Sequence, residues 1–306
     1  AKDMTAKLMA EVDIIVPLTH LNIQDDLLLA KTIPGFPLII GGHDHDNMRH
    51  MVGNTVVAKA DANAKTAYIH TLTYNKKTHQ YRVDSKLVKI DEKLEEEVRT
   101  KSRVDHWNNI ATDDLARKGF DPDKVITYLD SPLDGRESTV RGGQCDLGSL
   151  VAKAITAACS ERVDGTIVNS GSIRVDDMLS GNLTQYDIIR ILPYPSKIIE
   201  VEMTGTLLKK IMETSVQNRG QGAYLQVDKI TIDESTLTFK FGNKMLRTDR
   251  NYIIAMTDFL LTGYDYKFLT RETEGIINIV SADANNAQDL RNDLRKAAIS
   301  FLENHH

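Results

Sequence analysis

Three histidines stand where their side chains could act together. His20 ends an expected strand over residues 14–20, and His43 and His45 follow a second apolar run after two consecutive glycines. If the two runs are parallel neighbouring strands, all three histidines lie at the carboxyl edge of one sheet, where open α/β sheets bind ligands. In extended backbone, His43 and His45 would point to the same side because they are two residues apart. Imidazole nitrogens bind zinc, manganese and iron, so the pattern predicts a metal site.

An alternative interpretation of these histidines stays open. Each could be a hydrogen-bonded loop residue at a strand end, which is the more common role for any single histidine. The combination of a strand-end histidine with Gly-Gly-His-x-His favours the metal site. The remaining internal histidines lack such a setting and are expected to be structural: His50, His70, His79 and His106.

The elements that would position these residues alternate in α/β fashion over the first part of the chain. Residues 2–10 and 27–30 have helical patterns, and residues 12–17 and 36–40 are β-rich apolar runs. Apolar strands separated by helices indicate a sheet covered on both faces. Residues 55–87 alternate polar and apolar residues around a polar turn at 75–77, which predicts antiparallel hairpins.

A charged helix is expected over residues 91–118, with Asp91 as its cap and Gly119 at its end. We place the domain boundary there, although an ordinary surface helix within one domain would show the same pattern. The remainder is expected to be α+β. Amphipathic helices are predicted at 147–158, from Thr204 onward and at 287–302, and strands at 165–169, 197–203, 225–232, 236–241 and 252–257.

Composition excludes several classes of function. The chain of 306 residues has 43 acidic and 38 basic residues and therefore a net charge of −5. This charge disfavours general binding to nucleic acids and to membrane surfaces. No apolar stretch approaches the roughly 20 residues of a spanning helix. The two cysteines, Cys145 and Cys159, build neither a disulfide framework nor a zinc site.

The histidine segments resemble a known family. Leu18-Thr19-His20-Leu21 and Ile39-Ile40-Gly41-Gly42-His43-Asp44-His45 are similar to the second half of a calcineurin-like metallophosphoesterase domain, and more specifically to the 5'-nucleotidase family. The resemblance implies two divalent metal ions, zinc or manganese, with His20 and His43 on one ion and His45 on the other. It also implies a periplasmic or extracellular enzyme.

Five segments in the second part of the chain extend the resemblance in order and spacing. They are Leu147-Gly148-Ser149-Leu150, Asn169-Ser170-Gly171-Ser172-Ile173-Arg174, Leu192-Pro193-Tyr194, Gly222-Ala223-Tyr224-Leu225-Gln226-Val227 and Asp258-Phe259-Leu260 through Gly263-Tyr264-Asp265. The resemblance implies that Arg174 contacts a nucleotide phosphate, Asn169 approaches the nucleoside, Tyr194 and Phe259 sandwich the base, and Asp265 accepts from ribose hydroxyls. Arg141 is a further phosphate candidate; it lies two residues before the position of the family's usual arginine, where this sequence has a glycine. Each of these side chains could instead have a purely structural role.

The implied fold is α/β plus α+β. Residues 1–90 would be the C-terminal part of a metallophosphoesterase α/β sandwich, residues 91–120 a linker helix, and residues 121–306 the mixed-sheet 5'-nucleotidase C-terminal domain that binds substrate. The family's DxH, GD and GNHE motifs do not occur here, so the expected catalytic histidine is absent. We therefore expect a fragment with little or no activity of its own. In Gly263-Tyr264-Asp265-Tyr266, two tyrosines replace family glycines and could line the base slot.

The expected function is metal-dependent hydrolysis of nucleotide phosphate esters by the complete protein, with a nucleotide or nucleoside as the binding partner. Three alternatives remain: a non-catalytic nucleoside-binding module, a relative that cleaves 2',3'-cyclic nucleotides or nucleotide sugars, and a structural domain whose motifs are core and turns.

Overall fold

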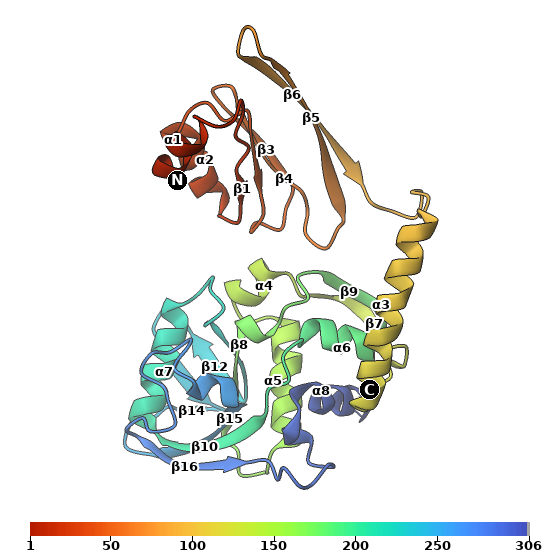
Figure 1. Ribbon diagram of the computed structural model, residues 1–306. Helices are drawn as coiled ribbons and strands as arrows, with labels where there is room; N and C mark the ends of the chain where they lie inside the picture. Colours follow the sequence, from red (N-terminus) through yellow and green to blue (C-terminus); the bar gives the residue numbers. More distant parts are fainter. Residues whose placement is uncertain (305–306) are drawn as a thin grey trace. The chain divides into compact units, whose positions relative to one another are not determined.

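The computed structural model describes residues 1–304, which divide into two compact units (Figure 1). Unit 1 comprises residues 1–105 and unit 2 begins at His106. The division falls within helix α3 (Val98–Arg117), inside the predicted linker. No helix among residues 1–304 is long and apolar enough to cross a membrane.

Unit 1 is built on a four-stranded sheet in the order β1-β2-β4-β3. β2 pairs in parallel with both β1 and β4, whereas β3 runs antiparallel to β4. The elements of this layer are α1 (Lys2–Leu8), β1 (Leu18–Thr19), α2 (Ile23–Thr32), β2 (Leu38–Gly41), β3 (Met48–Val52) and β4 (Thr55–Lys59). The predicted first strand is shorter and later than expected, since only Leu18 and Thr19 pair with β2.

Both faces of this sheet are covered, as the continuous apolar strands predicted. Ala30 of α2 packs with Ile39 and Val57 on one face. On the other face, Leu38, Val56 and Ala58 contact Tyr68 and Val83 of a long hairpin (Figure 1). The hairpin consists of β5 (Thr66–Asn75) and β6 (Gln80–Lys89), which pair antiparallel along their whole length. It confirms the expected hairpin and its polar turn.

Helix α3 begins seven residues later than the sequence analysis predicted. Asp91 does not cap it; its carboxylate accepts instead from the Lys93 amide in a turn. Glu97 provides the cap, because its side chain accepts from the amides of Arg99 and Thr100. An acidic side chain at this end stabilises a helix by pairing with otherwise unsatisfied N–H groups.

Unit 2 contains a five-stranded mixed sheet in the order β11-β8-β15-β10-β16. β8 and β15 are parallel, and the other pairs are antiparallel. The strands are β8 (Gly165–Asn169), β10 (Ile198–Thr204), β11 (Leu225–Asp228), β15 (Asn251–Thr257) and β16 (Ile276–Ser281). β16 was not predicted. The expected strand 225–232 is two strands, because Lys229, with a φ of 59°, breaks it.

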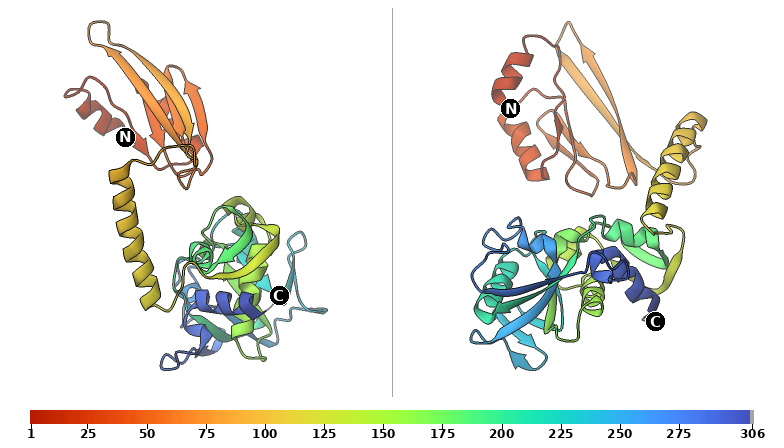
Figure 2. Two further views of the ribbon diagram at one scale, coloured as in Figure 1. Left: turned by 90° about the vertical axis from the view of Figure 1, so that its right-hand side faces the viewer. Right: turned by 60° about the horizontal axis from the view of Figure 1, so that its bottom comes forward.

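Helices cover the two faces of this sheet and bury separate cores. α5 (Asp146–Ala158) and α8 (Leu294–Asn304) pack together on one face, and α7 (Gly205–Gln217) packs on the other. In the right-hand view of Figure 2, teal α7 and dark-blue α8 lie on opposite sides of the sheet. α7 begins directly after Thr204, close to the predicted start, and the Thr204 side chain caps it by accepting from the Leu207 amide. α8 begins seven residues after the predicted start.

The remaining elements of unit 2 are short and surround the sheet. They are β7 (Val125–Asp134), α4 (Glu137–Gly142), the 3₁₀ helix η1 (Ser170–Ser172), β9 (Met178–Thr184), α6 (Gln185–Ile191), β12 (Ile230–Asp233), β13 (Thr238–Phe241), β14 (Lys244–Met245), η2 (Asp258–Leu261) and η3 (Leu290–Asn292). The α/β layer of unit 1 and the mixed sheet of unit 2 confirm the predicted fold class.

Candidate functional site

The strand pairing in unit 1 brings two of the three predicted metal ligands together. Because β1 and β2 are parallel and in register at Thr19 and Gly41, His20 and His43 leave the same edge of the sheet. Their rings lie 5.4 Å apart, centre to centre, in an edge-to-face arrangement. A Cβ on Gly42 would come within 3.1 Å of His20 Nδ1, so this glycine permits the close approach.

His45 is not grouped with His20 and His43 in the part of the chain that the structure describes. The extended backbone that would put His43 and His45 on a shared side is not present, because His43 has a φ of 74°. No three His, Cys, Asp or Glu side chains within residues 1–304 are grouped so as to hold a metal ion. The histidines as placed therefore do not fit the dinuclear centre that the resemblance implies, and their role as ligands stays a prediction.

A buried lysine holds the turn that carries these histidines. Lys59, at the end of β4, has a fully buried side chain and forms an ion pair of 2.8 Å with the equally buried Asp26 of α2. Its ammonium also donates to the carbonyl oxygens of Leu21 and Gly42, at 2.5 and 2.9 Å, and to Asp44 Oδ2 at 2.6 Å. Lys59 thus ties together the chain after β1, helix α2 and the turn after β2.

The charge balance around Lys59 favours its protonated form. Burial alone would lower the pKa of Lys59, but the hydrogen bonds and charges of Asp26 and Asp44 outweigh burial and raise it above its usual value. Gly41 makes the arrangement possible, because a Cβ there would lie 2.7 Å from Lys59 Cε. This network had no counterpart in the sequence analysis.

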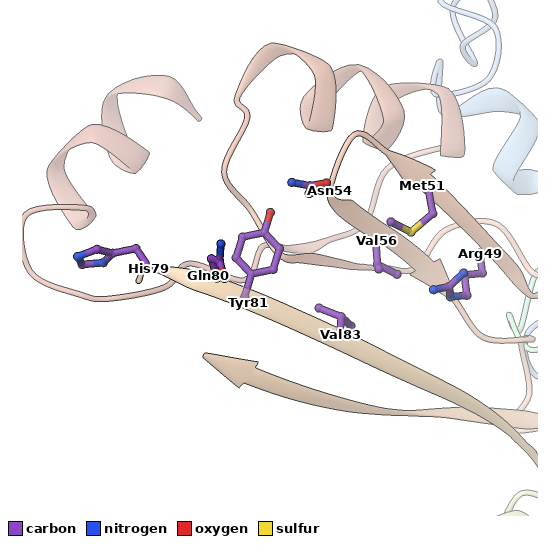
Figure 3. A pocket seen from close by; sticks show the side chains of 8 residues that line it. All are labelled: Arg49, Met51, Asn54, Val56, His79, Gln80, Tyr81 and Val83. Carbon is purple, nitrogen blue, oxygen red and sulfur yellow. The ribbon is translucent and has the colours of Figure 1, made fainter. Parts of the chain in front are cut away.

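A cavity of about 470 Å³ in unit 1, between the sheet and the β5–β6 hairpin, is not lined by His20, His43 or His45 (Figure 3). In Figure 3, Tyr81 and Val83 point from β6 toward Asn54 and Val56. The lining residues are Arg49, Met51, Asn54, Val56, His79, Gln80, Tyr81 and Val83. None of the predicted site residues is among them.

Unit 2 gathers every predicted substrate-binding residue around one cavity of about 460 Å³. The six come from four separate parts of the sequence: Arg141, Asn169 with Arg174, Tyr194, and Phe259 with Asp265. Five further residues complete the lining: Gly171, Ser172, Ser196, Gly222 and Tyr264. The motifs could have indicated most of these, since Gly171 and Ser172 lie within the segment 169–174 and Gly222 begins the segment 222–227. Ser196 carried no sequence signal.

The cavity lies beside the end of the central strand β8. Asn169 is its last residue, and η1 turns the chain immediately afterwards. The Gly171 amide donates to the Gly222 carbonyl at 2.7 Å, and a Cβ on Gly171 would come within 3.2 Å of that oxygen. Both positions therefore favour glycine, and they hold the two motif segments in contact.

A buried amide and a carboxylate form the polar part of the lining. Asn169 Nδ2 donates to Asp265 Oδ2 at 2.9 Å, and Ser172 Oγ donates to Asn169 Oδ1 at 2.6 Å. Burial raises the pKa of Asp265, and the hydrogen bond from Asn169 opposes this rise. The second carboxylate oxygen of Asp265 remains available to accept from a ligand hydroxyl.

Two arginines and a glutamate form the cationic part. Glu137 Oε1 contacts Arg141 Nη2 one turn along α4 and lies 3.8 Å from Arg174 Nη1. Burial, followed by the charge of Arg174, lowers the pKa of Arg141. Arg141 Nε is buried with no hydrogen-bond partner among residues 1–304. Glu137 was not among the predicted site residues.

Three aromatic side chains line the rest of the cavity. Tyr194, which stands between two prolines, and Tyr264 are largely exposed, at 58% and 73%. The rings of Phe259 and Tyr264 lie 5.9 Å apart at an angle of 50°. Tyr266 behaves differently from Tyr264, since it is 1% exposed and donates to the Ala223 carbonyl at 2.6 Å. Of the two tyrosines noted in the sequence, only Tyr264 lines the cavity.

Two glutamines hold the backbone at the end of α4, the helix that carries Arg141; Gln226 is fully buried and Gln144 is exposed. Gln226 Nε2 donates to the carbonyls of Val140 and Gly143, both at 2.7 Å, and its Oε1 accepts from the Cys145 amide at 3.1 Å. Gln144 in turn donates to the Leu225 carbonyl at 2.7 Å. These bonds fix the end of α4 and the residues after it against β11, so the position of Arg141 is built into the fold.

Comparisons with known proteins agree with this architecture. Residues 125–271 match the family model described as "5'-nucleotidase, C-terminal domain". The chain is 28% identical over 291 residues to the trifunctional nucleotide phosphoesterase protein YfkN of Bacillus subtilis, covering 87% of this chain and 19% of that protein. It is 24% identical over 339 residues to a 5'-nucleotidase of Vibrio cholerae, covering 94% of this chain and 61% of that protein.

A solved structure is similar over almost the whole chain. The crystal structure of a 5'-nucleotidase precursor from Thermus thermophilus aligns with a TM-score of 0.77 at 18% identity, covering 98% of this chain and 63% of that one. At this identity the likeness establishes the fold. The chain thus spans less than two thirds of the length of each of these three proteins.

Proposed function

We propose that the protein hydrolyses phosphate esters of nucleotides and that unit 2 binds the nucleotide. The match of residues 125–271 to the 5'-nucleotidase C-terminal domain supports this proposal. One observation carries the proposal. Six side chains that the motifs selected one by one, from distant parts of the sequence, line a single cavity of about 460 Å³. Its size lies within the range of small-molecule sites.

The lining offers a partner for each part of a nucleoside monophosphate. The guanidinium groups of Arg141 and Arg174 suit the phosphate, which they can bind through charge-assisted hydrogen bonds. Asp265 is placed to accept from ribose hydroxyls, and Asn169 orients its carboxylate. Tyr194 and Phe259 present aromatic faces to a base.

Metal-dependent catalysis is a separate part of the proposal. The resemblance implies two divalent ions, zinc or manganese, at His20, His43 and His45, together with an extracellular or periplasmic location. When bound, such ions would polarise the phosphate and activate water. Because residues 1–304 contain no grouped set of three ligands, we expect little or no phosphate release from this chain alone, even with metal added.

A non-catalytic nucleoside-binding module is the second candidate function. It is favoured because all six predicted substrate-binding residues line the cavity in unit 2, whereas no three possible metal ligands are grouped within residues 1–304. The two candidates make the same prediction for binding. They differ in whether the complete protein releases phosphate from nucleoside monophosphates, 2',3'-cyclic nucleotides or nucleotide sugars in the presence of zinc or manganese.

Calorimetric titration of the full chain with adenosine, adenosine 5'-monophosphate and ribose 5-phosphate tests the binding proposal. We expect Phe259→Ala to lower the affinity for adenosine and for its monophosphate alike, by about tenfold, because the substitution removes base stacking. Arg174→Ala should lower the affinity for adenosine 5'-monophosphate and for ribose 5-phosphate, and it should leave the affinity for adenosine unchanged. Tyr128→Ala and Arg271→Ala replace exposed side chains outside the cavity and serve as controls.

Two results would overturn the binding proposal. One is the absence of binding of adenosine and its monophosphate by the unaltered chain. The other is a loss of affinity in the two controls equal to that in Phe259→Ala and Arg174→Ala, since this would show that the cavity is not the binding site.

A further inference from the structure

Three consecutive residues at the cavity have three different environments. Tyr264 is exposed at the cavity, Asp265 lines it with a half-buried carboxylate, and Tyr266 is buried in the core of unit 2. Tyr266 donates to the Ala223 carbonyl, next to the cavity residue Gly222. The buried tyrosine therefore anchors the loop, and the exposed one is presented by it.

The loop around Tyr264 is held in one conformation by local hydrogen bonds. The amide and hydroxyl of Thr262 donate to the Phe259 carbonyl at 3.0 and 2.7 Å, and the Tyr264 amide donates to Thr262 Oγ1 at 3.3 Å. Gly263, with a φ of 75°, takes a conformation that favours glycine and turns the chain before Tyr264. An aromatic ring on such a loop loses little conformational freedom when a ligand binds.

The geometry points to Tyr264 as a residue that determines base specificity. We propose that its ring extends the aromatic surface of Phe259, so that the cavity binds the two-ring purine bases in preference to the one-ring pyrimidines. The inference rests on the proposed nucleotide binding by unit 2. Its basis is the position of Tyr264 in the lining, 5.9 Å from Phe259 and inclined by 50°, with most of its surface uncovered.

The difference in stacking area between purine and pyrimidine bases is what would distinguish the two classes of base. A base that contacts Phe259 alone stacks on one ring, and either class of base has a face large enough to do so. A ring inclined beside Phe259 is reached only by the part of a base that extends beyond it, and a purine extends further than a pyrimidine. The ammonium of Lys267 lies 5.8 Å from the centre of the Tyr264 ring, on a residue of the same loop, and favours this placement through a cation–π contact.

The test is calorimetric titration of the full chain and its variants with adenosine, guanosine, cytidine and uridine. We expect the unaltered chain to bind the purine nucleosides about tenfold more tightly than the pyrimidine ones. Tyr264→Ala should weaken purine binding about fivefold and pyrimidine binding less than about twofold. Tyr264→Phe keeps the ring and should keep the preference. Tyr128→Ala, another largely exposed tyrosine of unit 2, is the matched control.

The outcomes separate this inference from the proposed function. If Phe259→Ala weakens all four nucleosides while Tyr264→Ala leaves the purine-to-pyrimidine ratio unchanged, the specificity role of Tyr264 is wrong and nucleoside binding stands. If the unaltered chain binds none of the four, the proposed function itself fails. Because Tyr264 is exposed, its variants should fold, and an unchanged melting temperature verifies this.

Discussion

Asn169 and Asp265, which are 96 positions apart in the sequence, share a 2.9 Å hydrogen bond from Nδ2 to Oδ2 in the cavity of unit 2. The bond fixes a carboxylate at a place where burial works against its charge, since the pKa of Asp265 is raised. At ligand sites, an ionised side chain that lowers the stability of the folded state is common. We therefore expect stability and binding to respond to this carboxylate in opposite directions.

Asp265→Asn should stabilise the fold and weaken ligand binding. The raised pKa means that ionised Asp265 lowers the stability of the folded state at neutral pH, and that this cost disappears as the pH falls below the ordinary value of 3.8. At pH 7 the variant should therefore have a higher unfolding free energy than the unaltered chain, and the gain should vanish as the pH falls below 3.8. Its affinity for adenosine should fall about tenfold.

Denaturant unfolding of both proteins between pH 3 and 8, with titration of adenosine at pH 7, checks the expectation. A gain in stability that is the same at every pH would contradict the role assigned to the charge of Asp265. Ser172→Ala removes a neighbouring hydroxyl without removing a charge, and its stability difference from the unaltered chain should not depend on pH.

Glu137→Gln should strengthen the binding of phosphate-bearing ligands. Glu137 lies against Arg141 and 3.8 Å from Arg174, so its negative charge opposes a phosphate at the two guanidinium groups. Glutamine keeps an oxygen for Arg141 and removes the charge. We expect the affinity for adenosine 5'-monophosphate to rise about threefold to tenfold at low salt, and the affinity for adenosine to stay the same.

Titrations of both ligands at two salt concentrations measure this difference. An equal change for the two ligands would show that Glu137 acts by shaping the cavity and not through its charge. Glu234→Gln is a suitable control, because Glu234 pairs with Arg219 outside the cavity.

The sequence predicted elements best where one periodic pattern coincided with one element. The apolar positions from Leu147 to Ala158 predict α5 almost to the residue, and the run 165–169 is strand β8. Helix α3 was predicted too long because the acidic residues before it look helical, yet Glu97 caps the helix and the preceding residues form a turn. The pairing of β7 with β9 was missed, since β7 is irregular and its register shifts twice.

Site residues were predictable when they belonged to a motif and not when their role depended on a contact across the fold. Glu137 resembles an ordinary i,i+4 partner of Arg141 in sequence, and only the approach of Arg174 reveals a shared charge cluster. Lys59 stands in an unremarkable strand, and its four partners come from three other segments. The left-handed backbone of His43 likewise has no signal in the sequence.

Gly148→Ala should destabilise unit 2 and disturb the end of helix α4, which carries Arg141. A Cβ on Gly148 would lie 2.1 Å from Gln226 Oε1, and the fully buried Gln226 cannot move without breaking its bonds to Val140 and Gly143. We expect a loss of about 2 kcal/mol in unfolding free energy and weaker binding of adenosine 5'-monophosphate.

Gly142→Ala is the matched control for this substitution, six residues away. Its Cβ would meet no atom within 4 Å, so thermal unfolding should show little change. Equal melting temperatures for the two variants would contradict the proposed packing of Gly148 against Gln226.

Lys59→Met should strongly destabilise unit 1, because it leaves Asp26 fully buried without a positive partner. Removing one member of a buried ion pair costs about 3–5 kcal/mol. Hydrogen exchange at the amides of Ile39 and Val57, in the strands beside this pair, should accelerate accordingly, while amides of β8 in unit 2 should not. Adding Asp26→Asn to Lys59→Met should restore part of the protection, since a neutral amide is less costly to bury.

Lys76→Met, which breaks the exposed pair with Asp13, should leave exchange unchanged. Equal acceleration in Lys59→Met and Lys76→Met would show that the buried network does not hold the histidine turn in place.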